Sequence, residues 1–498
     1  MADGWRCFRC IAAARNVITV EPVLFLYMLG SFLQFTAVQQ LIRYKVCVIN
    51  YNDTVLCNNL TGHKEEEDEV IKQASHWIII LNVALTVPSV ISSLFLGSWS
   101  DAVGRKSIIL LPTVGTIIYC GFLIVSAAFT YLSVWIIIAG QAILGATGAF
   151  AILTSAVFSY LGDVTTKENR TLRFGILESM TFLGSFVGNA TGGVIIDRYG
   201  YITCFIFIIS CEVVIIVYVV VWLKESVSQY GRQGMTERIE VSVEADLGQV
   251  EVKNKCIELL RVDHFKKAVL VIFQKRPQKR RLQIIFLVVC LFIFELVGTV
   301  FQFSGARDTT VLYVTKEPLS WNATLVGLFL GLKNLSSGFG LLCVLPLVHF
   351  IGLGDPIIAA GSTVVRMCGY ILMAFARTTT VMFLVIVPMA VSGIPAACTR
   401  AMLSKLVLTS EQGSLFSFAA AVETTTTFLG SFIFNAIFPA TLDILQGGFI
   451  YLLMAAMLVV PVILLLWVRD LKKYDNTYQI QEEAVEGKTP SATSSILS

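Results

Sequence analysis

The chain has 498 residues, of which 56% are hydrophobic and only 14% are charged. A soluble protein carries about 25% charged residues, so much of this apolar surface must face lipid instead of water. The formal net charge of +3 is too small to indicate a nucleic-acid partner. The composition therefore predicts an integral membrane protein whose constant partner is the lipid bilayer.

Apolar segments long enough to cross a membrane recur along the whole chain. A spanning helix needs about 20 predominantly apolar residues. Six such segments precede a long polar stretch, and six follow it. They are predicted at 23–42, 76–98, 107–128, 132–161, 171–196, 201–223, 282–305, 323–349, 352–376, 379–399, 413–437 and 445–468. The sequence thus predicts an all-α membrane protein with twelve transmembrane helices in two six-helix halves.

These segments divide the chain into five parts. They are an N-terminal segment 1–22, a first half 23–223, a linker 224–281, a second half 282–468 and a tail 469–498. Lysine and arginine gather in the first segment, in the linker and at the start of the tail. Because cytoplasmic loops carry the excess of positive charge, we expect both termini to be cytoplasmic.

The loop predicted between the first two helices, 43–75, has the opposite character. It contains the acidic run 65–69 and two cysteines, Cys47 and Cys57, which we expect to form a disulfide on the oxidising side. Sequons for N-glycosylation on that side begin at Asn52, Asn59 and Asn322.

The two halves also share sequence. Residues 181–190 read TFLGSFVGNA and residues 427–436 read TFLGSFIFNA, with eight of ten positions identical at an offset of 246. The fifth predicted helix thus matches the eleventh, as expected for two repeated halves. The fifth helix also has glycines at 184, 188, 192 and 193. They suit close packing of helices, either within one half or between the halves.

A charged motif connects the second and third predicted helices. Residues 97–106 read GSWSDAVGRK and resemble the G-x-x-x-D-x-x-G-R-K loop of the major facilitator superfamily. Gly104 permits a tight turn, and Asp101 and Arg105 can form a charge-assisted lock. We therefore expect Asp101, Gly104 and Arg105 to act in gating at the cytoplasmic face.

Charged side chains inside the predicted helices are the strongest indication of function. Each costs about 2.5–3.5 kcal/mol at mid-membrane, so seven unpaired charges would cost about 20 kcal/mol. They must pair or face a wet cavity, and they indicate an ion or substrate pathway. The seven residues are Glu178, Glu212, Glu295, Glu423, Lys333, Arg366 and Arg400.

Acids and bases of this kind suit proton-coupled transport. A carboxyl group removed from water holds its proton more tightly and can exchange it near neutral pH. A buried arginine stays charged and grips a carboxylate with two parallel hydrogen bonds. The combination favours coupled movement of a proton and an organic anion.

A narrower resemblance appears at the tenth helix. The stretch 399–407, TRAMLSKLV, followed by 411–416, EQGSLF, is similar to the proton-coupled folate transporter family. That family includes a thymic stromal cotransporter and a lysosomal symporter of steroid conjugates. Further matches are VEP at 20–22, SHW at 75–77 and EPLSWN at 317–322, so the resemblance covers nearly the whole chain.

The resemblance assigns roles to several of the intramembrane charges. It implies that Arg400 binds the anionic substrate and that Glu178 couples proton movement. The neighbourhood of Glu423 resembles the lysosomal member, which makes Glu423 a second candidate for proton coupling. Lys333, Arg366 and Glu295 have no named counterpart and are candidates for the substrate path.

Other functions fit the sequence less well. A proton-independent facilitator or exchanger of the same fold, or a lysosomal exporter of steroid conjugates or muropeptides, stays open. A receptor or scaffold signalling through the linker is disfavoured, because 226–256 shows little periodicity. No HExxH or GxSxG motif points to an enzyme, and we expect neither metal nor cofactor. Without an acidic dileucine signal in the tails, we favour the plasma membrane over the lysosome. The sequence names neither substrate nor oligomeric state.

Overall fold

The computed structural model describes most of both predicted halves. The described residues are 18–53, 56–57, 64–226, 272, 274, 279–298, 310, 313–314, 318–321, 323–408, 411–441 and 444–471. Most of the N-terminal segment, the linker and the tail, together with Asn59 and Asn322, lie outside them. Among the described residues there are helices and turns but no strand.

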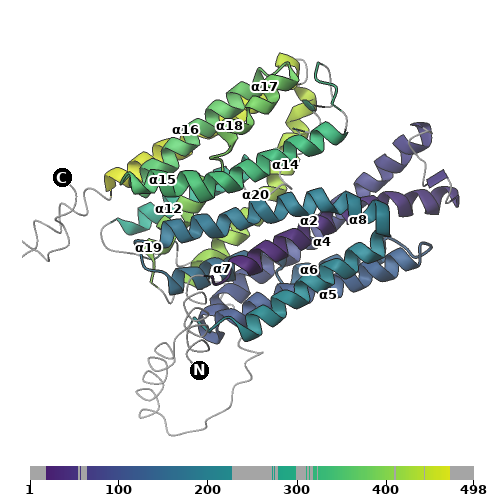
Figure 1. Ribbon diagram of the computed structural model, residues 1–498, viewed down its shortest axis with the longest axis horizontal. Helices are drawn as coiled ribbons and strands as arrows, with labels where there is room; N and C mark the ends of the chain where they lie inside the picture. Colours follow the sequence, from purple (N-terminus) through teal and green to yellow (C-terminus); the bar gives the residue numbers. More distant parts are fainter. Residues whose placement is uncertain are drawn as a thin grey trace, which may run out of the picture.

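Long helices run roughly parallel along the molecule (Figure 1). The first half contains α2 (Glu21–Tyr51), α4 (Lys64–Val103), α5 (Arg105–Ala128), α6 (Trp135–Ala146), α7 (Ala149–Val164) and α8 (Arg170–Val221). The second half contains α12 (Arg280–Leu296), α14 (Ala323–Phe339), η2 (Gly340–Val344), α15 (Leu345–Phe350), α16 (Asp355–Ala374), α17 (Thr379–Leu384), α18 (Ile386–Met389), α19 (Ile394–Leu406), α20 (Gln412–Ala440), η4 (Ile444–Gly447) and α21 (Phe449–Met457).

The predicted twelve-helix fold is confirmed. In the described part of the chain, ten helical segments are long and apolar enough to cross a membrane. Two of them come from α8, which is broken at Gly200, where φ is 79°. The short helices α17, α18 and α19 together form one span, Thr379–Leu406. The 17-residue α12 and the 29-residue α20 supply the remaining two of the twelve.

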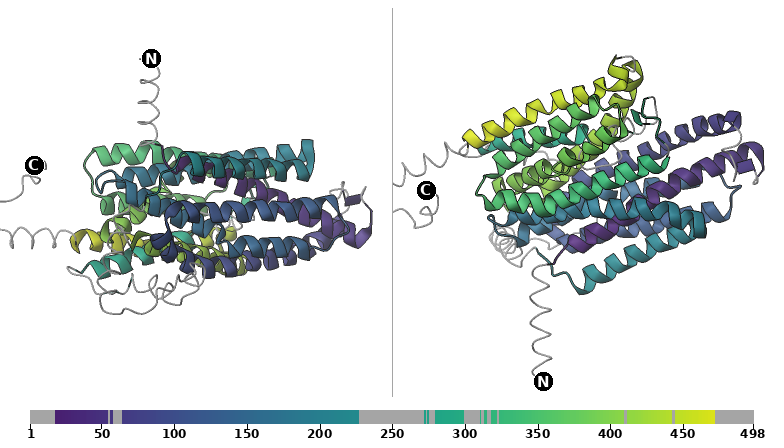
Figure 2. Two further views of the ribbon diagram at one scale, coloured as in Figure 1. Left: turned by 90° about the horizontal axis from the view of Figure 1, so that it is seen from below. Right: turned by 45° about the horizontal axis from the view of Figure 1, so that its top comes forward.

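The helices of the two halves lie beside each other as two groups (Figures 1 and 2). One cluster of buried apolar side chains is built from the second half, with Phe182 of α8 as its member from the first. A second cluster is built from the first half, with Ala401 of α19 and Phe416 of α20 as its members from the second. These three side chains mark where the two cores meet.

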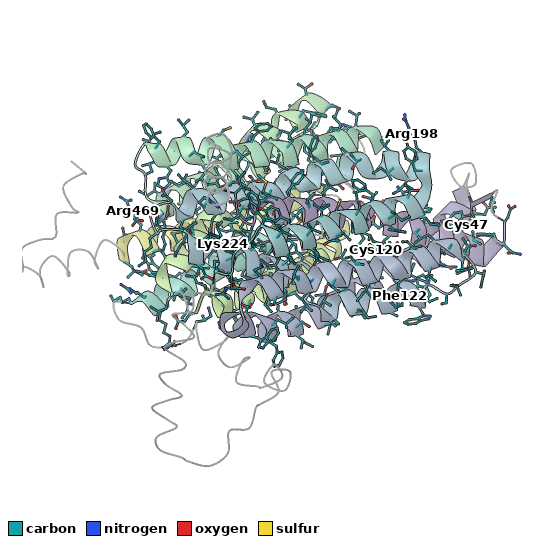
Figure 3. All side chains as sticks on the ribbon, turned by 60° about the horizontal axis from the view of Figure 1, so that its bottom comes forward. Cys47, Cys120, Phe122, Arg198, Lys224 and Arg469 are labelled. Atoms are coloured by element: carbon teal, nitrogen blue, oxygen red, sulfur yellow. A yellow bond between two sulfur atoms is a disulfide. The ribbon has the colours of Figure 1, made fainter. Side chains whose placement is uncertain are left out.

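The two ends of the bundle differ in the residues they carry. Lys224 and Arg469 lie toward one end, and Cys47 and Arg198 lie toward the other (Figure 3). The Trp222 Nε1 atom donates to the main-chain oxygen of Ile18, at 3.5 Å. Ile18, the first described residue, therefore lies at the same end of the bundle as Lys224 and Arg469. We call this end of the bundle the terminal end.

The helices at the opposite end are longer than the sequence predicts. α2 continues to Tyr51 and α4 starts at Lys64, so the acidic run 65–69 belongs to a helix and not to a loop. Acidic residues favour the first turns of a helix because they interact well with its dipole. The Tyr51 hydroxyl donates to Glu69 Oε2 at 3.0 Å, and Cys47 and Cys57 form a disulfide with a Cα–Cα distance of 5.7 Å.

The fourth predicted span is broken in the middle. Gly148 has φ of 85° and separates α6 from α7, which leaves main-chain oxygens without their helical partners. The Ser92 hydroxyl of α4 supplies such a partner by donating to the Ala146 main-chain oxygen at 2.8 Å, and the Ser89 hydroxyl adds a bond of 2.9 Å to the Gly148 oxygen, which also accepts from the Ile152 N–H at 3.1 Å. Free backbone groups within a membrane need such partners, so α4 makes the break tolerable.

The glycines of the fifth span pack within one half. A Cβ atom at Gly184 would lie 2.7 Å from the Phe25 main-chain oxygen, and one at Gly188 would lie 2.7 Å from that of Leu29. Both contacts are with α2. At these two positions the plain packing interpretation therefore holds, because the glycines let α8 approach α2 of the same half.

We predict that Gly184→Ala destabilises the protein by about 1–3 kcal/mol, because the added methyl group overlaps backbone atoms of α2. Thermal unfolding of the purified protein measures this. Gly193→Ala is the matched control, since nothing lies within 4 Å of a Cβ atom there. It should be neutral or stabilise by about 0.5–1 kcal/mol. Equal melting temperatures for the two variants would contradict the packing role of Gly184.

Candidate functional site

A single buried arginine organises the interior of the bundle. Arg400, on α19, is 3% exposed. Its Nη1 donates to Glu178 Oε2, its Nε and Nη2 donate to Glu423 Oε1 at 3.1 and 2.8 Å, and its Nη2 reaches Glu295 Oε1 at 3.5 Å. We call these four residues the Arg400 cluster. It joins α8 of the first half to α12, α19 and α20 of the second.

The Arg400 cluster has more acids than bases. All three glutamates are buried, and with every carboxyl ionised the cluster would have a net charge of −2. Within the described residues, Glu178 Oε1 and Glu295 Oε2 have no hydrogen-bond partner. A buried carboxylate oxygen without a donor is costly, so these oxygens are places where protons can bind.

The cluster lies deep in the bundle. At 1.5 Å rise per residue, Glu178 is about 12 Å along α8 from its first residue at the terminal end. The Arg400 Cζ atom lies 5.0 Å from the ring centroid of Phe158, a distance that suits a cation–π contact. Phe158 also packs against Phe174 and Phe416, with centroids 5.2 and 5.9 Å away. These rings close off the terminal-end side of the cluster.

Polar contacts between the halves continue toward the terminal end. Ser155 of α7 and Ser417 of α20 share a hydrogen bond of 2.7 Å. Arg170, at the start of α8, donates to the main-chain oxygen of Ser404 at 3.0 Å, and Lys405 donates to the Thr171 hydroxyl at 2.8 Å. The two halves are thus fastened together at the terminal end.

The motif that carried the family resemblance explains these contacts. Gln412 and Ser404 exchange two hydrogen bonds of 2.8 Å, and Lys405 also binds Asp355 at 2.7 Å. Sequence analysis singled out Arg400 from this motif but assigned no role to Ser404, Lys405 or Gln412. All three residues lie in the stretch that carries the family resemblance, and this was the one sign in the sequence that they matter.

The predicted gate has a partner that the sequence did not identify. Arg105 is buried, and its Nε donates to Asp163 Oδ2 at 3.0 Å. The Asp101 side chain lies outside the described residues, and Asp163, at the end of α7, was not predicted. The main-chain N–H of Arg105 donates to Glu225 at 2.7 Å. Gly104 has φ of 117°, and a Cβ there would lie 2.6 Å from Glu225, so this turn requires glycine.

Lys333 and Arg366 occupy other helices of the second half. Arg366, on α16, is fully buried and donates from Nη2 to the Tyr370 hydroxyl at 3.1 Å. The Tyr370 hydroxyl in turn donates to the main-chain oxygen of Val297, the residue that follows α12, at 3.2 Å. In the described part of the chain, Arg366 Nε and Nη1 have no hydrogen-bond partner. Lys333 is half-buried on α14.

The predicted glycosylation sites are only partly described. Asn52 ends α2 and is exposed. It lies five residues beyond Cys47, at the end of the bundle opposite the terminal end. Asn59 and Asn322 are not among the described residues.

Comparison with known proteins identifies the family. Residues 22–431 match the Major Facilitator Superfamily. The chain belongs to this superfamily of transporters. The lysosomal proton-coupled steroid conjugate and bile acid symporter of Gallus gallus is 28% identical over 472 residues, covering 91% of this chain and 94% of the relative. The proton-coupled folate transporter of Rattus norvegicus is 28% identical over 457 residues, covering 90% and 91%. The narrower resemblance seen in the sequence is therefore confirmed.

Solved structures of superfamily members share the fold. The human organic anion transporter MFSD10 superposes with a TM-score of 0.64 at 14% identity, covering 90% of this chain and 98% of that structure. The fucose:proton symporter of E. coli gives a TM-score of 0.61 at 12% identity, covering 90% and 97%. At this level of identity the likeness is one of architecture.

We predict that Arg170→Ala loosens the terminal end, because it removes the hydrogen bonds from Arg170 to Ser404, Gly162 and Thr165. Cys398, buried on α19, should then react faster with a maleimide, as measured by mass spectrometry of the labelled peptide. The control is Arg173→Ala, since Arg173 pairs with Glu21 of the same half at 2.7 Å. Equal labelling of Cys398 in both variants would show that Arg170 does not hold the halves together.

Proposed function

We propose that this protein is a secondary transporter that couples the movement of an organic anion to that of a proton through the Arg400 cluster. The observation that carries the proposal is one buried arginine shared by three carboxylates from both halves. A site between two halves can open to each side in turn as the halves rock. Such alternating access is the basis of the cycle proposed below.

The surplus of acids supplies the coupling. Protonation of Glu178 removes the charge that its carboxyl group presents to Arg400 and releases one N–H of the guanidinium. The carboxylate or sulfate of a substrate can then take the vacated position, because arginine offers two parallel donors to such groups. When the Glu178 carboxyl group loses its proton to the other side of the membrane, the Glu178–Arg400 ion pair forms again and displaces the anion. Proton and anion thus move in the same direction.

The relatives support this chemistry. Both are named as proton-coupled, and their named substrates are folate for one and steroid conjugates and bile acids for the other. These classes of compound carry carboxylate or sulfate groups beside large ring systems. We propose a substrate of the same kind, with Glu423 as a second proton acceptor and with Glu295, Lys333 and Arg366 lining the substrate path.

Two alternatives share the fold. A proton-independent exchanger would use Arg400 to bind an anion and keep the glutamates as permanent counter-ions. A lysosomal exporter would use the same site with acid on the lumenal side. The surplus negative charge of the cluster favours proton coupling over the first alternative, because permanent ionisation of three buried carboxyls beside one arginine is costly.

We propose that the terminal end is cytoplasmic and that the protein acts at the plasma membrane. The first proposal follows from the lysines and arginines of the linker and tail. On this orientation the contacts of Arg170 and Lys405 close the path to the cytoplasm.

We predict that Arg400→Ala abolishes anion uptake. The loss of charged hydrogen bonds costs about 1.5–3 kcal/mol, or roughly 10–150-fold in affinity. Arg400→Lys should keep some binding, because the charge stays while the two-pronged geometry is lost. Uptake of a radiolabelled folate, a steroid sulfate and a bile acid into proteoliposomes with an imposed pH gradient measures both effects. The exposed Glu69 on α4 supplies the control variant Glu69→Gln.

We predict that Glu178→Gln removes the stimulation of uptake by acid but preserves exchange of labelled for unlabelled anion, since exchange needs no net proton release. Uptake and exchange are compared across pH at matched amounts of protein. A Glu178→Gln transporter that is still fully stimulated by acid would reject Glu178 as the coupling residue and leave Glu423 to be tested. Anion uptake unaffected by pH in the wild type would favour the proton-independent exchanger.

We predict that Asn52 carries a glycan, because the opposite end would face the lumen or the exterior. Treatment with a glycosidase should shift the electrophoretic mobility of the wild type, and the shift should be smaller after Asn52→Gln. Surface biotinylation of the same cells tests the plasma-membrane location. A glycosidase shift that survives substitution of Asn52, Asn59 and Asn322 together would contradict the orientation.

A further inference from the structure

A second acidic group is buried away from the Arg400 cluster. Glu212 lies in the second span of α8 and is fully buried. Neither of its carboxyl oxygens has a hydrogen-bond partner among the described residues. Each glutamate of the Arg400 cluster has a guanidinium within 3.5 Å. Glu212 is therefore in a different electrostatic situation from the three glutamates of the Arg400 cluster.

The side chain of Glu212 faces α2. A Cβ atom at Gly30 would lie 3.6 Å from Glu212 Oε1 and 3.5 Å from Ile208, so glycine leaves room for the carboxyl group. The titratable groups that lie close enough to feel the charge of an ionised Glu212 are the Tyr27 hydroxyl of α2, the Cys120 thiol of α5 and the adjacent Cys211 thiol. None of them is a cation.

Polar groups in this region make contacts with other partners. The Thr116 hydroxyl of α5 donates to the Pro112 main-chain oxygen at 3.0 Å. The Cys120 thiol points to Gln34 Oε1 at 3.8 Å. An ionised carboxylate with neither a cation nor a donor would cost several kcal/mol more than the neutral acid at this buried position. Glu212 therefore holds a proton in this conformation.

Polar side chains connect this position with less buried ones. Tyr27, Ser31 and Gln34 follow one another at intervals of four and three residues, which places them on one face of α2. Thr116 and Cys120 are similarly spaced on α5. Tyr27 is buried, whereas Ser31 and Gln34 are half-buried. The Cys120 thiol and Gln34 Oε1, 3.8 Å apart, join the polar faces of the two helices, which offer hydroxyl, thiol and amide groups for the passage of a proton.

We propose that Glu212 is a second proton-binding site, located within the first half and reached through the polar face of α2 that contains Tyr27, Ser31 and Gln34. The ligand is a proton alone, because no cation or ordered donor accompanies the carboxyl group. The site is independent of the anion chemistry proposed for the Arg400 cluster. It gives the first half a proton of its own, in addition to any that the cluster binds.

Infrared spectroscopy of the full-length protein in lipid nanodiscs tests this without any substrate. The wild type should show the C=O stretching band of a protonated carboxyl group at the high frequency of one without a hydrogen bond. Glu212→Gln should remove this band, and Glu212→Asp should shift it. The control variant Glu69→Gln, at an exposed position, should retain it. An unchanged band in Glu212→Gln would overturn the proposal.

Hydrogen–deuterium exchange of the same band tests the route. Transfer to D₂O should shift the band of the wild type as the carboxyl proton is replaced. Tyr27→Phe should slow this shift severalfold, because it removes the α2 hydroxyl that interacts electrostatically with Glu212. A band that never exchanges, or that exchanges equally fast in Tyr27→Phe, would overturn the proposal. Since no anion is present, these outcomes are distinct from failure of the proposed symport.

Discussion

A guanidinium charge deep within a lipid-embedded bundle is the constraint on which the rest of the structure depends. Arg400 cannot lose its proton under ordinary conditions, and leaving it unpaired would cost several kcal/mol. The protein meets this requirement with carboxylates from three other helices: Glu178 of α8, Glu295 of α12 and Glu423 of α20. The charge on α19 therefore fixes which helices must converge at the centre. Because one of the three belongs to the other half, the same charge also joins the halves.

Contacts between the halves are arranged in layers from this charge toward the terminal end. The ion pairs come first, then the rings of Phe158 and Phe416, and then the hydrogen bonds from Arg170 to Ser404 and from Lys405 to Thr171. The innermost layer is the one that contains the three buried carboxyl groups paired with Arg400. A change of charge there weakens a contact between the halves, which physically connects chemistry at the centre with opening at the end.

Irregular helices occur where close approach is needed. The break at Gly148 is made tolerable by the serines of α4. The π-helical turn η2 begins at Gly340, where a Cβ atom would lie 1.9 Å from the main-chain oxygen of Ala390. Single-turn π-helices are common at functional positions, and this one lies in the span that faces α8. At Gly340 the lack of a side chain thus permits a close approach that another residue would block.

The sequence by itself determined the membrane class, the twelve spans and the importance of Arg400, because apolar run length and a charged motif are local properties. The family resemblance singled out Glu178, but the sequence did not show that Glu178 contacts Arg400 while Glu212 has no hydrogen-bond partner among the described residues, since both are single acids in apolar helices. It identified Arg105 but not Asp163, which lies 58 residues away along the chain. It placed 65–69 in a loop, although those residues extend α4. Pairing of charges depends on which helix faces come together, and only tertiary packing decides that.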